Sequence, residues 1–152
     1  MNDDLPAERC NALALRQATR HVSQFYDRHL AATGLKGTQF SIVARLVRRG
    51  PSSIGDLARD LVLDRTTLGR NLRPLERDGL VVLAADPVDR RTRLLTATPA
   101  GKARYEQALP AWKAAQQAFE RAFGRSESAA LRDLMRAVTR TSLEAPADPA
   151  SA

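Results

Sequence analysis

Cysteine is almost absent from this chain, whose 152 residues include only Cys10. A single cysteine excludes an internal disulfide and a zinc site built from a cysteine cluster. Long apolar runs are missing too, because no stretch approaches the roughly 18 residues that a membrane span needs. The first residues include Asp3 and Asp4, and no apolar segment follows them, which argues against a secretory signal. We therefore expect a cytoplasmic protein without a membrane partner.

The sequence also lacks motifs that carry catalysis. It has no glycine-rich phosphate loop, and no serine or cysteine beside a plausible base. His21 and His29 lie eight residues apart, but nothing supplies further ligands at a suitable spacing. A polar helix face is the simpler interpretation of the two histidines. We expect a protein that is not an enzyme and needs neither a metal nor another cofactor.

Lysine is rare, whereas arginine is abundant: the 24 basic residues include only Lys36, Lys102 and Lys113 as lysines. The guanidinium group presents a rigid fork of donors that suits phosphates and guanine edges. The formal net charge of +7 favours a polyanionic partner. At this level the alternative is an arginine-rich surface that binds nothing.

Periodic apolar positions, bounded by caps and breakers, predict a mainly α-helical chain with one small β-hairpin. Hydrophobic residues make up 43% of the chain, which is enough for a core. We expect helices over 5–32, 38–48, 54–60, 64–78, 99–123 and from 126 onward, and strands over 80–85 and 93–97. The expected helix caps are Thr38, Ser53, Asp64, Thr98 and Ser126. Pro6 suits the first turn of the first helix, and Pro74 and Pro110 are expected to kink theirs.

The two short helices over 54–60 and 64–78 are separated only by residues 61–63, which is typical of a helix-turn-helix. The second helix of such a pair enters the major groove of DNA. On a helical wheel its leucines gather on one side, and its opposite side carries Thr66, Arg70, Arg73 and Arg77. The loop over 86–92 has arginines at its tip and joins the two strands, so we interpret it as a wing.

These residues resemble the MarR family of winged helix-turn-helix transcriptional regulators. The resemblance rests on three stretches, in this order: Ile54-Gly55-Asp56-Leu57-Ala58 with residues 63–68, then residues 75–81, then residues 86–91 with 95–101. It implies an α+β fold, mainly α with a small β-wing. It also implies a homodimer in which the first, fifth and sixth helices of the two copies interlock. The domains would be an N-terminal dimerisation helix (5–33), a winged helix-turn-helix (34–98), C-terminal dimerisation helices (99–143) and a mobile tail (144–152).

The resemblance also implies roles for single residues. Arg91 matches the wing arginine that enters the minor groove, and Asp89 matches the acid that holds it, through a bidentate pair. Arg90 and Arg93 are expected to contact phosphates. The full set expected at DNA is Ser53, Arg65, Thr66, Thr67, Arg70, Asn71, Arg73, Arg77, Asp89, Arg90, Arg91 and Arg93. Solvated surface is the alternative for the arginines, because residues 61–96 hold seven arginines but also five acids.

The function implied is a dimeric, sequence-specific regulator that binds double-stranded DNA. Its operator would be pseudo-palindromic, with half-sites about 10 base pairs apart. We expect a repressor that a small effector releases. The effector cleft of the family would be lined here by Arg16, Arg20, Phe25, Phe40 and Trp112, which suits an aromatic or anionic ligand. Alternatively, the two phenylalanines belong to the core and Trp112 to the dimer interface.

Two other functions remain open at this point. One branch of the family senses peroxides through a cysteine on the first helix, which would fall here at Ala12. Cys10 lies two residues away, about 200° around a helix, so a plain buried or interface thiol is the simpler interpretation. The other alternative is a winged-helix module that binds a protein instead of DNA.

Overall fold

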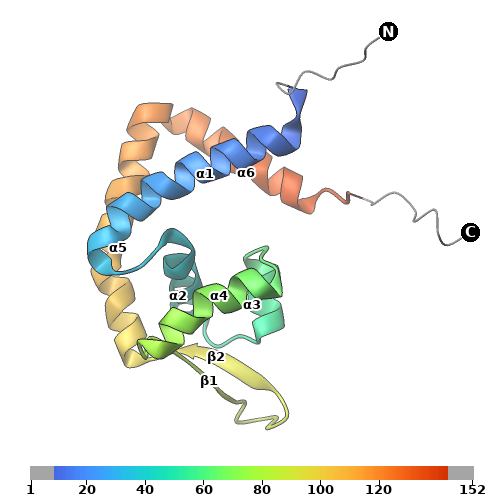
Figure 1. The fold of residues 1–152 in the computed structure, drawn as a ribbon, viewed down its shortest axis with the longest axis vertical. Helices are drawn as coiled ribbons and strands as arrows, with labels where there is room; N and C mark the ends of the chain where they lie inside the picture. The colour runs from blue at the N-terminus through green and yellow to red at the C-terminus, as the bar shows by residue number, and fades with distance from the viewer. Residues whose placement is uncertain (1–8, 144–152) are drawn as a thin grey trace, which may run out of the picture. The chain divides into compact units, whose positions relative to one another are not determined.

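The computed structural model describes residues 9–143 as nine elements, with the fold class expected from the sequence (Figure 1). In chain order they are α1 (Asn11–Leu30), the 3-10 helix η2 (Ala31–Thr33), α2 (Gly37–Arg49), α3 (Ile54–Asp60), α4 (Arg65–Arg77), β1 (Val81–Ala85), β2 (Arg93–Ala97), α5 (Pro99–Phe123) and α6 (Arg125–Arg140). The chain forms two compact units, one ending at Gln116 and the other beginning at Gln117, within α5. The expected tail over 144–152 and Pro6 lie outside the described residues.

Three of the expected caps are confirmed, because each is decided by neighbours in the chain. The Ser53 hydroxyl accepts a hydrogen bond from the Asp56 amide at 3.1 Å, and Thr98 Oγ1 accepts one from the Gly101 amide at 3.0 Å. Asp64 Oδ1 accepts from the Thr67 amide at 2.8 Å. A side-chain acceptor at this position satisfies an amide that has no partner within the helix.

Other expected helix starts are wrong. Asn11 begins α1, because Cys10 is extended and its Sγ accepts from the Leu13 amide at 3.4 Å. Residue Thr38 lies inside α2, whose first amide, that of Gly37, donates to Asp27 Oδ1 of α1 at 2.7 Å, while the Lys36 amide just before the helix donates to Gln39. Residue Ser126 lies inside α6, which starts directly after Gly124 at φ 104°. In the last two cases a tertiary contact and a glycine turn replace the hydroxyl cap.

Neither helical proline ends its helix. The helix α4 continues past Pro74 to Arg77, and α5 continues past Pro110 to Phe123. The expected kinks therefore remain predictions. Gly79, at φ 67°, follows the end of α4 and leads the chain into the wing.

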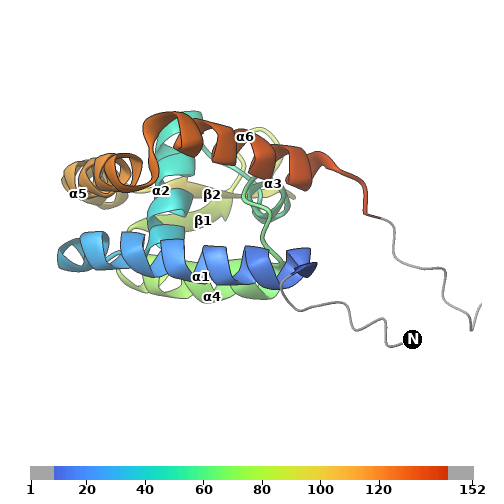
Figure 2. The ribbon, with the colours of Figure 1, turned by 90° about the horizontal axis from the view of Figure 1, so that it is seen from above.

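The core of the first unit lies between α2, α3, α4 and the base of the hairpin. Leu68, Leu72 and Leu75 of α4 are buried, as the helical wheel predicts. Burial of each such side chain stabilises the fold by about 1.5–3 kcal/mol. The strands β1 and β2 are antiparallel, with Leu83 opposite Leu95 (Figures 1 and 2). Buried Ser52, just before α3, exchanges two backbone hydrogen bonds with Leu95, which ties the wing to the start of α3.

Candidate nucleic-acid interface and ligand pocket

The exposed face of α4 carries cations because its opposite face is buried leucine. Thr66, Arg65, Arg70 and Arg73 are all exposed. Among the described residues, none of these three arginines forms an ion pair or a side-chain hydrogen bond. Their guanidinium groups are therefore available to phosphates or base edges without the loss of an existing partner.

Two other expected contacts on α4 are already engaged. The Thr67 hydroxyl donates to Asp64 Oδ2 at 2.6 Å, and this bond is the main reason that the pKa of Asp64 lies below its ordinary value. The Arg77 guanidinium donates to Asp78 at 2.9 Å and lowers the pKa of that carboxyl, although Arg77 remains exposed. Both carboxylates are charged at neutral pH, so Thr67 stabilises the helix start and Arg77 must leave a partner to bind DNA.

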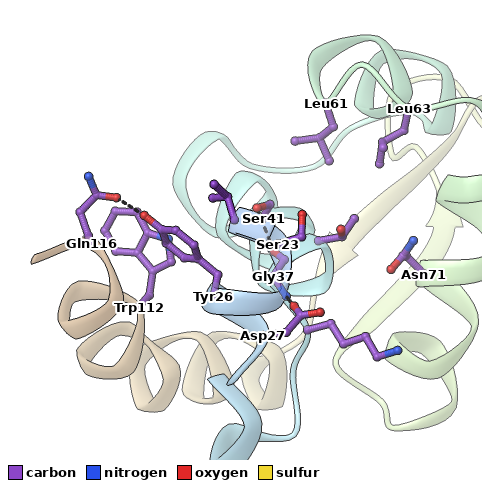
Figure 3. A pocket seen from close by; sticks show the side chains of 13 residues that line it. Ser23, Tyr26, Asp27, Gly37, Ser41, Leu61, Leu63, Asn71, Trp112 and Gln116 are labelled. Carbon is purple, nitrogen blue, oxygen red and sulfur yellow. Dashed lines mark hydrogen bonds between the residues drawn. The ribbon is translucent and has the colours of Figure 1, made fainter. Parts of the chain in front are cut away.

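The structure places Asn71 away from the face that carries Arg70. Its amide nitrogen donates to the Thr67 carbonyl at 2.9 Å, and its half-buried side chain lines a pocket beside α1 and α2 (Figure 3). Asn71 is about 60° from Leu68 around the helix, which puts it at the edge of the buried side. The expectation that Asn71 reads a base therefore does not fit this geometry.

The wing also differs from the expected arrangement. Among the described residues, no ion pair joins the side chains of Asp89 and Arg91; Asp89 Oδ1 instead accepts from the Arg91 amide at 3.0 Å and Oδ2 from the Thr92 hydroxyl at 3.3 Å. In a turn this tight, the backbone amide two residues on is nearer to a short carboxylate than a guanidinium is. Asp89 therefore shapes the loop, while Arg90 and Arg91 are left exposed at its tip.

The remaining expected contacts flank these elements. Arg93 donates to the Leu83 carbonyl at 3.0 Å, which fastens its side chain to the neighbouring strand. The hydroxyl of Ser53 donates to Asp56 Oδ2 at 2.7 Å and is the largest cause of the lowered pKa of that carboxyl. The Ser53 hydroxyl thus caps α3, and the residue is half-buried. The expected contact between Ser53 and a phosphate stays a prediction.

A pocket of about 480 Å³ lies within the first unit, between α1, α2, α4, α5 and the turn after α3 (Figure 3). Its apolar lining includes Leu61, Leu63 and Trp112. The Tyr26 hydroxyl donates to Gln116 Oε1 at 2.6 Å across one wall. The other polar lining residues are Ser23, Asp27, Lys36, Thr38, Ser41 and Asn71. A mixed lining of this kind suits a ligand that has both apolar and polar groups.

Only one of the expected ligand residues lines this pocket, namely Trp112. Phe40 is buried in the core, where its ring stacks on those of Tyr105 and Trp112 at 5.5 and 5.9 Å. Phe25 packs against the rings of Tyr26 and His29. The side chains of Arg16 and Arg20 are exposed on α1 and lie outside the lining.

The residues of α1 that line this pocket differ from those expected at an effector cleft. The helix turns Ser23, Tyr26 and Asp27 toward the pocket, and these three positions are spaced by three and four residues. Asp27 also binds the Gly37 amide at the start of α2. A tyrosine and an aspartate on one helix face are the sequence feature that could have predicted this lining.

Residues 33–92 match the MarR family. The transcriptional regulator MosR of Mycobacterium tuberculosis, whose structure is known in complex with DNA, is 34% identical, with a TM-score of 0.69 over 87% of this chain and 99% of that one. The HTH-type regulator YxaD of Bacillus subtilis is 32% identical over 100 residues, which are 58% of this chain and 70% of that protein. The chain belongs to the MarR family of winged helix-turn-helix transcriptional regulators.

The transcriptional activatory protein BadR of Rhodopseudomonas palustris is also similar, with 35% identity over 104 residues. That match covers 65% of this chain and 59% of BadR, so the present chain spans less than two thirds of that relative. Within this MarR-family chain, no helix of residues 9–143 is long and apolar enough to cross a bilayer.

The structure also shows the surroundings of His29 and Cys10 in this MarR-family chain. In residues 9–143 no three histidine, cysteine or acidic side chains gather as metal ligands. His29 Nδ1 lies 3.0 Å from the Phe25 carbonyl, within its own helix. Cys10 is exposed in the single chain, so it is not a buried thiol there, and the interface thiol stays a prediction.

Proposed function

We propose that this chain is a homodimeric, ligand-responsive repressor that acts in the cytoplasm on a pseudo-palindromic operator. The observation that carries the proposal is the exposed face of α4, where Arg65, Arg70 and Arg73 have no ion-pair partner within residues 9–143. The wing adds two more such arginines, Arg90 and Arg91. Positioned cations on a recognition helix and a wing can contact the major and minor grooves of one duplex. Binding, and not catalysis, is therefore the proposed activity.

The test begins with DNA selected from genomic fragments by the purified protein. The recovered duplex is then titrated at several salt concentrations beside a random duplex of the same length. A regulator prefers the recovered duplex by at least about a thousandfold, and its affinity falls steeply as salt rises. Equal, weak binding to both duplexes would instead support the protein-interaction alternative.

The proposed dimer is supported by the apolar face of α6. Leu134, Met135 and Val138 are exposed, Leu134 to 62%. They recur at helical spacing on a helix whose other positions are mostly charged or small. Apolar side chains gathered along one stripe of a helix are typical of a surface that packs against another helix. A second copy of the chain is the proposed partner.

Replacing Leu134 by aspartate should dissociate the dimer. The carboxylate would be desolvated in an apolar contact, which costs several kcal/mol, so we expect the dimer dissociation constant to rise at least about a hundredfold. Sedimentation equilibrium measures this constant. Ala129→Asp, on the other side of α6, adds the same charge and should leave the dimer intact. A dimer of unchanged strength in Leu134→Asp would contradict the interface.

The proposed effector site is the 480 Å³ pocket, with an aromatic ligand against Trp112. Within residues 9–143, the charged side chains that line it are the cation Lys36 and the anion Asp27. Since Asp27 Oδ1 already accepts from the Gly37 amide, Lys36 is the group that would attract a ligand carboxylate. The proposed ligand is therefore an aromatic acid that binds through its ring and one carboxylate.

Trp112 is the only tryptophan of the chain, so its fluorescence reports on the pocket. We expect 4-hydroxybenzoate to quench the emission saturably, and 4-hydroxybenzamide to bind about tenfold more weakly because it lacks the charge. Lys36→Met should remove that difference, whereas Arg20→Ala, outside the lining, should preserve it. The absence of saturable quenching by either compound would contradict the proposed ligand class.

A further inference from the structure

The last residue of α3, Asp60, occupies an electrostatically unfavourable position. A helix C-terminus carries partial negative charge, so a carboxylate there is repelled unless a cation compensates it. Arg45 of α2 supplies that cation: its Nε and Nη2 both lie 2.7 Å from Asp60 Oδ2. Arg49, one turn further along α2, approaches the same oxygen at 4.0 Å. Asp60 is thus the common partner of two arginines on the neighbouring helix.

The contact is partly shielded from solvent. The Arg45 side chain is 16% exposed and that of Asp60 is 34% exposed. The ion pair is therefore screened less by water than the other ion pairs among residues 9–143 that involve α3 or α4, whose arginines are at least 70% exposed. A charge-assisted contact of this geometry can hold one helix end against another.

This helix end decides where the recognition helix begins. Only Leu61, Val62 and Leu63 separate Asp60 from Asp64, the cap of α4. The Leu63 amide donates to the Ala58 carbonyl at 2.8 Å, and Val62 adopts a left-handed conformation at φ 52°, which is strained for a β-branched residue. Within the seven-residue α3, only Leu57 and Ala58 are buried. Packing alone therefore leaves the end of α3 weakly held, and the turn needs another restraint.

We propose that Arg45 and Asp60 are positioning residues that set the placement of α4 for DNA recognition. The inference rests on the proposed DNA-binding function. Neither side chain needs to contact DNA, because the pair acts through the end of α3 and the three-residue turn. Its loss should let the start of α4 move, which reduces specific contacts to bases more than nonspecific attraction to phosphates.

The test compares Asp60→Asn with Glu106→Gln, an exposed acid on α5 whose replacement changes the net charge equally. Affinities are measured for the genomically selected duplex and for a random duplex of equal length. We expect Asp60→Asn to lower the specific-to-random affinity ratio about tenfold, with no loss of random binding, while Glu106→Gln leaves the ratio unchanged. Arg45→Met should lower the ratio similarly, which guards against an effect peculiar to one substitution.

A second measurement does not depend on DNA. Amide hydrogen exchange at Leu61–Leu63 should be at least tenfold faster in Asp60→Asn than in the wild type, with the amides of α5 unchanged. The positioning role would be overturned if the exchange rate in Asp60→Asn equals that of the wild type. It would also be overturned if the wild type prefers the selected duplex and the variant has the same affinity ratio. If exchange is faster in the variant but the wild type shows no preference between the two duplexes, the proposed function is overturned. The restraint on the turn is then retained.

Discussion

Arg91→Ala is expected to weaken binding to the selected operator about 10- to 100-fold, equivalent to about 1–3 kcal/mol. Arg91 lies exposed at the tip of the wing, where Asp89 holds its backbone amide but not its guanidinium. The side chain is therefore free to enter a narrow minor groove, whose concentrated negative potential attracts a guanidinium. Gel-shift titration measures the loss.

The structure adds two controls to this experiment. Arg20→Ala removes the same charge from an exposed site on α1 and should leave the affinity almost unchanged. Asp89→Ala should also weaken binding, because the loop that presents Arg91 loses two hydrogen bonds to the Asp89 carboxylate. The thermal unfolding of Arg91→Ala should match that of the wild type, since this side chain is exposed and takes part in none of the ion pairs within residues 9–143. Equal operator affinity in Arg91→Ala and the wild type would refute the role of the wing.

Gly101→Ala is expected to destabilise the protein by about 3 kcal/mol, which would lower the melting temperature by roughly 6–12 °C. A Cβ at this position would overlap the Leu80 carbonyl oxygen and lie 3.0 Å from the carbonyl carbon. That oxygen already accepts a hydrogen bond from the Thr98 amide, so the chain cannot move aside without breaking the start of α5. Differential scanning calorimetry or urea denaturation measures the loss.

Gly69→Ala is the matched control, because Gly69 lies within α4 and a Cβ there meets nothing within 4 Å. Alanine is the better helix former, so this variant should be more stable than the wild type by up to about 1 kcal/mol. If Gly101→Ala unfolds at the wild-type temperature, the close approach of α5 to Leu80 does not exist in solution.

Much of the winged-helix unit could be predicted from the sequence because its signals are local. Ser53, Asp64 and Thr98 cap the helices that follow them by contacts only three residues long. The inward face of α4 follows from helical spacing alone, as does the placement of Arg70 on the opposite face. A hydrogen bond or a periodicity within one element does not depend on what packs against it.

The lining of the site depends on contacts between elements, which the sequence pattern does not predict. The rotation of α1 decides that Tyr26, and not Arg16 or Arg20, faces the pocket. The packing of α1 beside α2 decides that Asp27 binds the Gly37 amide. In each case the residue type is compatible with several partners. The side chain contacts the one that lies nearest to it in the folded chain.

By itself, therefore, the sequence determined the helix-turn-helix, the wing and the cationic face of α4, since each is encoded within a few residues of chain. The tertiary structure alone decided which side chains from different elements meet. The pairing of Arg45 with Asp60, fifteen residues apart and on different helices, is the clearest case. Helical spacing fixes the direction of a side chain only relative to its own helix, whereas an ion pair requires two helices to be placed against each other.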